Sequence, residues 1–85
     1  MPANTDSFTE AVAGAVRAEL GRKRKTVSEL AIVLGSSRPT VSRRVNGKEP
    51  FDVAELEKVA GFLGLSVHDI FASAQADSNR AAVAS

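Results

Sequence analysis

Apolar residues recur at helical spacing along most of the chain. Every fourth position from 8 to 20 is apolar, which predicts an amphipathic first helix. Similar stripes, with apolar residues three or four positions apart, follow four more times. The five predicted helices cover residues 8–22, 26–34, 38–46, 53–63 and a short segment that begins at residue 67. We therefore expect an all-α fold, a compact five-helix domain over residues 8–72.

Residues that start and stop helices stand at the boundaries of these segments. A serine or aspartate that can accept an unpaired backbone N–H precedes four of them. These residues are Ser7, Ser36 or Ser37, Asp52 and Ser66. Gly35 and Gly64 follow the second and fourth helices, where a helix end favours a residue that can adopt a positive φ angle. Outside the domain we expect a flexible N-terminus at residues 1–7 and a flexible or weakly helical tail at residues 73–85.

The second and third helices form the most sharply defined unit, two short helices joined by a Gly-Ser-Ser turn within residues 26–47. Val41 and Val45 lie one turn apart and would hold the third helix against the core. The opposite side carries Pro39, Arg43 and Asn46, with Ser42 at its border and Arg38 at the helix N-terminus. A short basic helix, half exposed and held against a preceding helix, is the geometry that enters the major groove of DNA.

Charge is unevenly distributed along the chain, although the net charge is only +1. Residues 17–48 hold nine basic and two acidic side chains, a balance of +7, and the remainder carries −6. Such a basic segment favours a polyanion as partner, and the alternative is a solvated basic surface. Within it, the basic run at residues 22–25 either complements the dipole of the first helix or contacts phosphates.

Composition excludes several classes of function. The chain has no cysteine, which rules out a disulfide framework, thiol catalysis and a cysteine-ligated metal. His68 is the single histidine, on a polar face, and no carboxylates cluster, so we expect no enzyme, no cofactor and no small-molecule ligand. No apolar run approaches the roughly 18 residues of a membrane span, and no signal peptide is evident. A cytoplasmic protein that does not contact a membrane is therefore expected.

Several short motifs occur in the order typical of one family. They are T-V-S-E-L-A at 26–31, L-G at 34–35, S-R-P-T-V-S-R at 37–43, N-G-K at 46–48 and L-G-L-S-V-H-D-I-F at 63–71. On these motifs the chain resembles the Cro/C1-type (lambda-repressor-like) helix-turn-helix DNA-binding domains, over about residues 8–72. The resemblance implies a transcriptional regulator, a phage-type repressor or Cro-like protein in a bacterial cell. It also implies a homodimer on a double-stranded operator, an inverted repeat.

The resemblance and the helix geometry together give a set of contact residues. The side chains expected to face bases are Arg38, Pro39, Ser42 and Arg43. Those expected at the phosphate backbone are Thr26, Ser37, Arg44, Asn46 and Lys48, with Arg24 and Lys25 from the basic run. Two residues depart from the family pattern. Val27 replaces a frequent glutamine, and Arg44 stands where many members have an apolar residue, so Arg44 has either a phosphate or an acidic side chain as its partner.

Apolar residues outside the stripes leave a second class of function open. Val27, Ile32 and Val33 do not share the face of Leu30 and Leu34, so the second helix is apolar nearly all round. An antitoxin-like or other protein-interaction helix-turn-helix module would use such a surface. Further along the chain, Phe62, Phe71 and the tail are the candidate homodimer interface.

Overall fold

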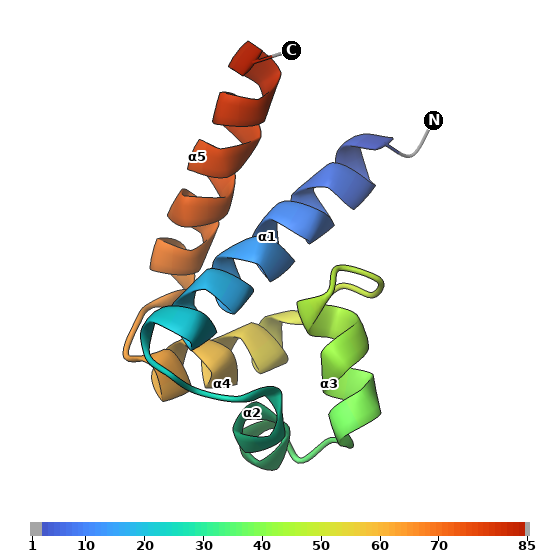
Figure 1. The fold of residues 1–85 in the computed structure, drawn as a ribbon. Helices are drawn as coiled ribbons and strands as arrows, with labels where there is room; N and C mark the ends of the chain where they lie inside the picture. Colours follow the sequence, from blue (N-terminus) through green and yellow to red (C-terminus); the bar gives the residue numbers. More distant parts are fainter. Residues whose placement is uncertain (1–2, 85) are drawn as a thin grey trace.

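The computed structural model describes the backbone of residues 3–84 and the side chains of residues 8–76. The described chain is all helical, and its five helices are arranged as a single body (Figure 1). They are α1 (Ala3–Arg22), α2 (Val27–Leu34), α3 (Arg38–Val45), α4 (Val53–Leu63) and α5 (Val67–Ala84). The predicted all-α, five-helix fold class is confirmed.

Three helices begin with the same reciprocal hydrogen-bond pattern, the capping box. The Thr26 hydroxyl accepts from Glu29 N at 3.1 Å while the Glu29 carboxylate accepts from Thr26 N at 2.8 Å. Asp52 with Glu55 starts α4, and Ser66 with Asp69 starts α5, in the same way. At α3 the capping residue is Ser37, whose hydroxyl accepts from Thr40 N at 3.3 Å. The predicted starts of α3, α4 and α5 are thereby confirmed.

The ends of the first four helices also share one geometry. The chain leaves each helix through a residue with a left-handed backbone, and the next N–H turns back to a carbonyl five residues earlier. The left-handed residues are Arg24 (φ 56°), Gly35 (φ 66°), Gly47 (φ 79°) and Gly64 (φ 72°). Local chemistry therefore sets the lengths of α2, α3 and α4.

Two helices are longer than the apolar stripes predicted. The expected start at Ser7 is wrong, because α1 begins at Ala3 and Ser7 lies inside it. The fifth helix is not short, because α5 extends to Ala84. No glycine or proline occurs in residues 65–85, and six of the 18 residues of α5 are alanine, the strongest helix former. The flexibility expected at residues 1–7 and 73–85 stays a prediction.

The predicted apolar stripes supply a single hydrophobic core to which all five helices contribute. The buried side chains are Val12, Ala13, Ala15, Val16, Leu20, Leu30, Ala31, Leu34, Val41, Val45, Leu56, Val59, Ala60, Leu63, Ile70 and Ala74. Val27 packs partly against them, so it does not belong to an exposed patch on α2. Ile32, by contrast, is 81% exposed and Val33 is also exposed.

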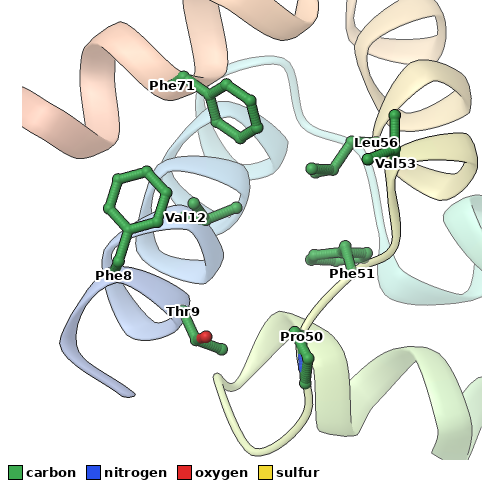
Figure 2. Close-up of a pocket in the computed structure, with 8 residues that line it drawn as sticks. All are labelled: Phe8, Thr9, Val12, Pro50, Phe51, Val53, Leu56 and Phe71. Carbon is green, nitrogen blue, oxygen red and sulfur yellow. The ribbon is translucent and has the colours of Figure 1, made fainter. Parts of the chain in front are cut away.

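A small apolar hollow lies where α1, α5 and the start of α4 meet, beside the chain that follows α3 (Figure 2). Its volume is about 180 Å³, and it is lined by Phe8, Thr9, Val12, Pro50, Phe51, Val53, Leu56 and Phe71. The rings of Phe8 and Phe71 lie 6.0 Å apart between centroids. Phe62 is elsewhere, partly buried against the core and covered by the Lys25 ammonium at 5.2 Å. Of the two aromatic residues predicted at an interface, Phe71 is the exposed one.

Candidate nucleic-acid interface

The third helix is held by one face and leaves the other face free. Val41 and Val45 are buried, and α3 packs against both α2 and α1. Residues 35–37 form the turn between α2 and α3 (Figure 1). Because α3 has eight residues, about two turns, two buried valines are enough to fix which side faces outward.

The outer face of α3 carries the predicted base-contacting residues together. Arg38, Pro39 and Arg43 are exposed, and Ser42 is half-buried at the border of that face. The Ser42 hydroxyl accepts a hydrogen bond from Asn46 Nδ2 at 3.3 Å. The structure therefore presents two arginines and a proline to solvent, with Ser42 linked to the end of the helix.

The predicted phosphate contacts divide into two groups. Ser37, Asn46 and Lys48 are exposed at the two ends of α3, and Thr26 is exposed at the start of α2. The hydroxyls of Thr26 and Ser37 both cap their helices, and Ser37 also donates to Thr40 Oγ1 at 2.9 Å. Because both hydroxyls are engaged in capping, a phosphate at Thr26 or Ser37 would meet the positive N-terminal end of a helix.

Arg24 and Lys25 lie in the turn between α1 and α2, apart from α3. Lys25 covers Phe62 near the C-terminal end of α4, and Lys23 Nζ would lie 3.8 Å from a Cβ added to Gly64. In Figure 1 this turn is at the end of α4 that points away from α3. The basic segment of the sequence is thus divided between the end of α1 with the turn after it and α3 with the loop after it.

Arg44 is directed inward, toward α4. Its Nη1 lies 3.4 Å from Glu55 Oε2, and the two side chains are only 23% and 16% exposed. Glu55 uses its other oxygen to accept from Asp52 N, so one carboxylate caps α4 and holds α3. Arg44 Nε is buried without a hydrogen-bond partner. The sequence left a phosphate or an acidic side chain as the partner of Arg44, and in the structure Arg44 pairs with an acidic side chain, Glu55.

Two side chains that the sequence did not single out also act on α3. Arg17 of α1 donates from Nη1 to the Val45 carbonyl oxygen at 2.7 Å and so caps the end of α3. Glu49, in the loop after α3, lies 3.2 Å from Arg43 Nε. The carbonyl that Arg17 contacts is 28 residues away, and no sequence pattern predicts such a contact. Glu49 lies six residues from Arg43, a spacing that does not match a pair within a helix.

Within the described residues no three His, Asp or Glu side chains gather in a way that could hold a metal ion. His68 and Asp69 are exposed at the start of α5. The pKa of Asp69 lies below its usual value because the Ser66 backbone N–H and hydroxyl donate hydrogen bonds to its carboxylate. No helix within the described residues combines the length and the apolar character that a membrane span requires.

A short helix resting on a preceding short helix, with its cationic face outward, defines a helix-turn-helix regulator domain. The chain belongs to the BetR domain family, whose model matches residues 7–83. This match does not identify the Cro/C1-type family that the motifs resemble.

Solved structures support the same class. The chain is similar to the crystal structure of the clp gene regulator ClgR from Corynebacterium glutamicum, with 28% identity and a TM-score of 0.85. That match covers 89% of this chain and 81% of the ClgR chain. A second ClgR crystal structure matches at 28% identity and a TM-score of 0.76, over 82% of this chain and 91% of that one. A comparison with curated proteins gives no match.

Proposed function

We propose that this protein is a transcriptional regulator that binds specific sites in double-stranded DNA with α3 in the major groove. The observation that carries the proposal is the division of α3 into a buried valine face and an exposed face with Arg38 and Arg43. The likeness to ClgR, described as a gene regulator, supports it. A protein with this function acts in the cytoplasm, on bacterial or phage DNA.

We assign each proposed contact residue a role from its position on the fold. Arg43, opposite the buried valines, is the residue we assign to guanine, whose O6 and N7 accept a bidentate pair of N–H groups. The other base contacts on this face are Arg38, Pro39 and Ser42. The phosphate contacts are Thr26, Ser37, Asn46 and Lys48 around α2 and α3, with Arg24 and Lys25 on the α1–α2 turn. Arg44 is left out of this set because Glu55 neutralises it.

We also propose that the protein binds as a homodimer. One eight-residue helix reads few base pairs, whereas a two-fold dimer reads two half-sites about 34 Å apart. Phe8, Val53 and Phe71, all exposed, line the same hollow and form the surface proposed for contact with the second copy. Occupying an operator is enough to block a promoter, so the proposed effect is repression, as the resemblance to phage-type and Cro-like repressors implies.

Selection of bound duplexes from a random pool tests this function directly. We expect enrichment of an inverted repeat, bound by two protomers. Arg43→Ala should then cost about 1–3 kcal/mol on the selected duplex and relax the preference at one base pair per half-site. Arg22→Ala, which removes one exposed cation from α1, is the matched control and should leave base preference unchanged. No enrichment, or an unchanged preference in Arg43→Ala, would contradict the proposal.

A second function has one observation in its favour, the exposed Ile32 on α2. In an antitoxin-like module this side chain would contact a partner protein, and Ile32→Lys would release that partner without changing DNA binding. Co-purification of a second protein with wild type but not with Ile32→Lys would favour this role.

A further inference from the structure

We propose that Glu49 positions Arg43 for base reading and thereby sets the selectivity of the interface. This inference rests on the proposed DNA-binding function. Arg43 Nε donates to Glu49 Oε2 at 3.2 Å, and Arg43 Nη2 makes a longer contact of 3.5 Å with Thr40 Oγ1. An acidic side chain therefore holds the arginine on the face that would meet DNA.

The turn after α3 brings Glu49 to this place. Lys48 N donates to the Arg43 carbonyl at 2.9 Å and Gly47 N donates to the Arg44 carbonyl at 3.1 Å. The chain thus reverses over the last turn of α3, through the left-handed Gly47. These bonds hold the backbone of residues 43–48 in a closed turn. Glu49 is the next residue, so it lies beside Arg43 as a consequence of the fold.

The contact with Glu49 uses Arg43 Nε, a nitrogen that end-on pairing with guanine does not need. A guanidinium has five N–H donors in a planar fork. With Nε engaged by Glu49, the edge formed by Nη1 and Nη2 remains for the O6 and N7 acceptors of guanine. On binding, Arg43 Nη2 would exchange its long contact with Thr40 Oγ1 for a hydrogen bond to guanine. Glu49 therefore fixes the plane of the fork in the orientation for end-on recognition.

The charge of Glu49 has a second effect on DNA affinity: positioning Arg43 favours binding, whereas the negative charge opposes it. Arg43 and Glu49 are 49% and 43% exposed, so their pair contributes little in the free protein. At a DNA surface the carboxylate repels phosphates of any sequence, while exclusion of water strengthens its bond to Arg43. Only a duplex with guanine opposite Arg43 gains the bidentate contact for which Glu49 orients the guanidinium. Glu49 thus lowers the affinity for all duplexes and increases the ratio of affinities between duplexes with and without guanine at the Arg43 position.

Glu49→Gln and Glu49→Asp separate the two effects. The measurements are the dissociation constants of each variant for the selected duplex, for the same duplex with the Arg43 base pair replaced, and for a scrambled duplex. Glu49→Gln should bind the scrambled duplex more tightly, and its discrimination at the replaced pair should fall by about fivefold or more, within the range for one bidentate contact. Glu49→Asp keeps the charge but shortens the side chain, so discrimination should fall without tighter binding to the scrambled duplex.

Two controls make the result decisive. Glu57→Gln removes an exposed carboxylate from α4 and should leave discrimination unchanged. In an Arg43→Ala background, Glu49→Gln should no longer alter discrimination, because the positioned group is missing. If both Glu49 variants keep wild-type discrimination, Glu49 acts only as a charge and the inference is wrong. If wild type enriches no sequence at all, the failure belongs to the proposed function.

Discussion

Arg24 occupies a backbone conformation that glycine adopts at three equivalent places in this chain. Its φ angle is 56°, and among the described residues it is the one non-glycine with a positive φ. For a residue with a Cβ, this conformation costs roughly 1–2 kcal/mol. The arginine is exposed and lies directly before the α2 N-terminal region. A strained arginine at this position is consistent with the phosphate contact proposed for it.

Arg24→Gly should therefore raise stability and weaken DNA binding. Relief of the left-handed strain should add about 1 kcal/mol to the free energy of unfolding, or about 4–8 °C in Tm for a domain of this size. Thermal unfolding followed by circular dichroism checks this. Lys23→Gly removes a neighbouring cation at a residue without positive φ, so it should bring no gain. A fall in Tm for Arg24→Gly would show that the side chain has stabilising contacts that outweigh the strain.

The direction of the two adjacent arginines was predictable, but the partner of Arg44 was not. At about 100° per residue, burial of Val41 and Val45 is enough to place Arg43 outward and Arg44 at the side. Glu55 lies eleven residues beyond Arg44 and on another helix, so their contact depends on how α3 and α4 pack. A sequence pattern carries no such information.

At the scale of the helices, Gly47 links the end of α3 to α1. A Cβ on Gly47 would lie 3.2 Å from Glu10 Cγ and 3.4 Å from Glu10 Cα. Gly35, which ends α2 with a similar φ, has open space around it. The two glycines thus have the same backbone requirement but different surroundings.

Gly47→Ala should destabilise the protein more than Gly35→Ala does. Gly35→Ala should cost roughly 1–2 kcal/mol, the price of a left-handed alanine. Gly47→Ala should cost this amount and more, because the loop must also move away from α1. Chemical denaturation of both variants measures the difference. Equal losses would mean that the loop after α3 shifts freely, and that the position of Glu49 beside Arg43 is not fixed by the turn.

Helix boundaries were predictable where a polar cap or a glycine marks them. Asp52, Ser66, Gly35 and Gly64 act within a few residues of their own position, so their effect is visible in the sequence. At α1 the polar cap expected at Ser7 is wrong because the helix begins earlier, and the end of α5 has no such marker. There the apolar stripe predicted where burial ends, and the backbone remains helical beyond it.

For the molecule as a whole, the fold decides how much of the basic segment is available to DNA. The sequence gives residues 17–48 a net charge of +7. Two of these cations are used inside the protein, because Arg17 caps α3 and Arg44 pairs with Glu55. A third, Arg22, pairs with Glu19 within α1. A count from sequence therefore overestimates the number of phosphates that the protein neutralises.

The salt dependence of binding tests this distribution. Lys23, Arg24, Lys25 and Lys48 are the exposed cations left for phosphates once Arg38 and Arg43 are assigned to bases. Each neutralised phosphate contributes about −0.9 to the slope of log K against log salt concentration, so four give a slope near −4 per protomer.

Two variants locate the charges that produce this slope. Lys48→Ala should make it shallower by about one. Arg44→Gln should weaken binding by loosening α3 while leaving the slope unchanged, because its charge is already compensated by Glu55. Circular dichroism of both variants verifies that the helices persist. A slope that becomes shallower in Arg44→Gln would show that Arg44 leaves Glu55 for a phosphate on DNA, and a flat slope in wild type would contradict DNA binding by this domain.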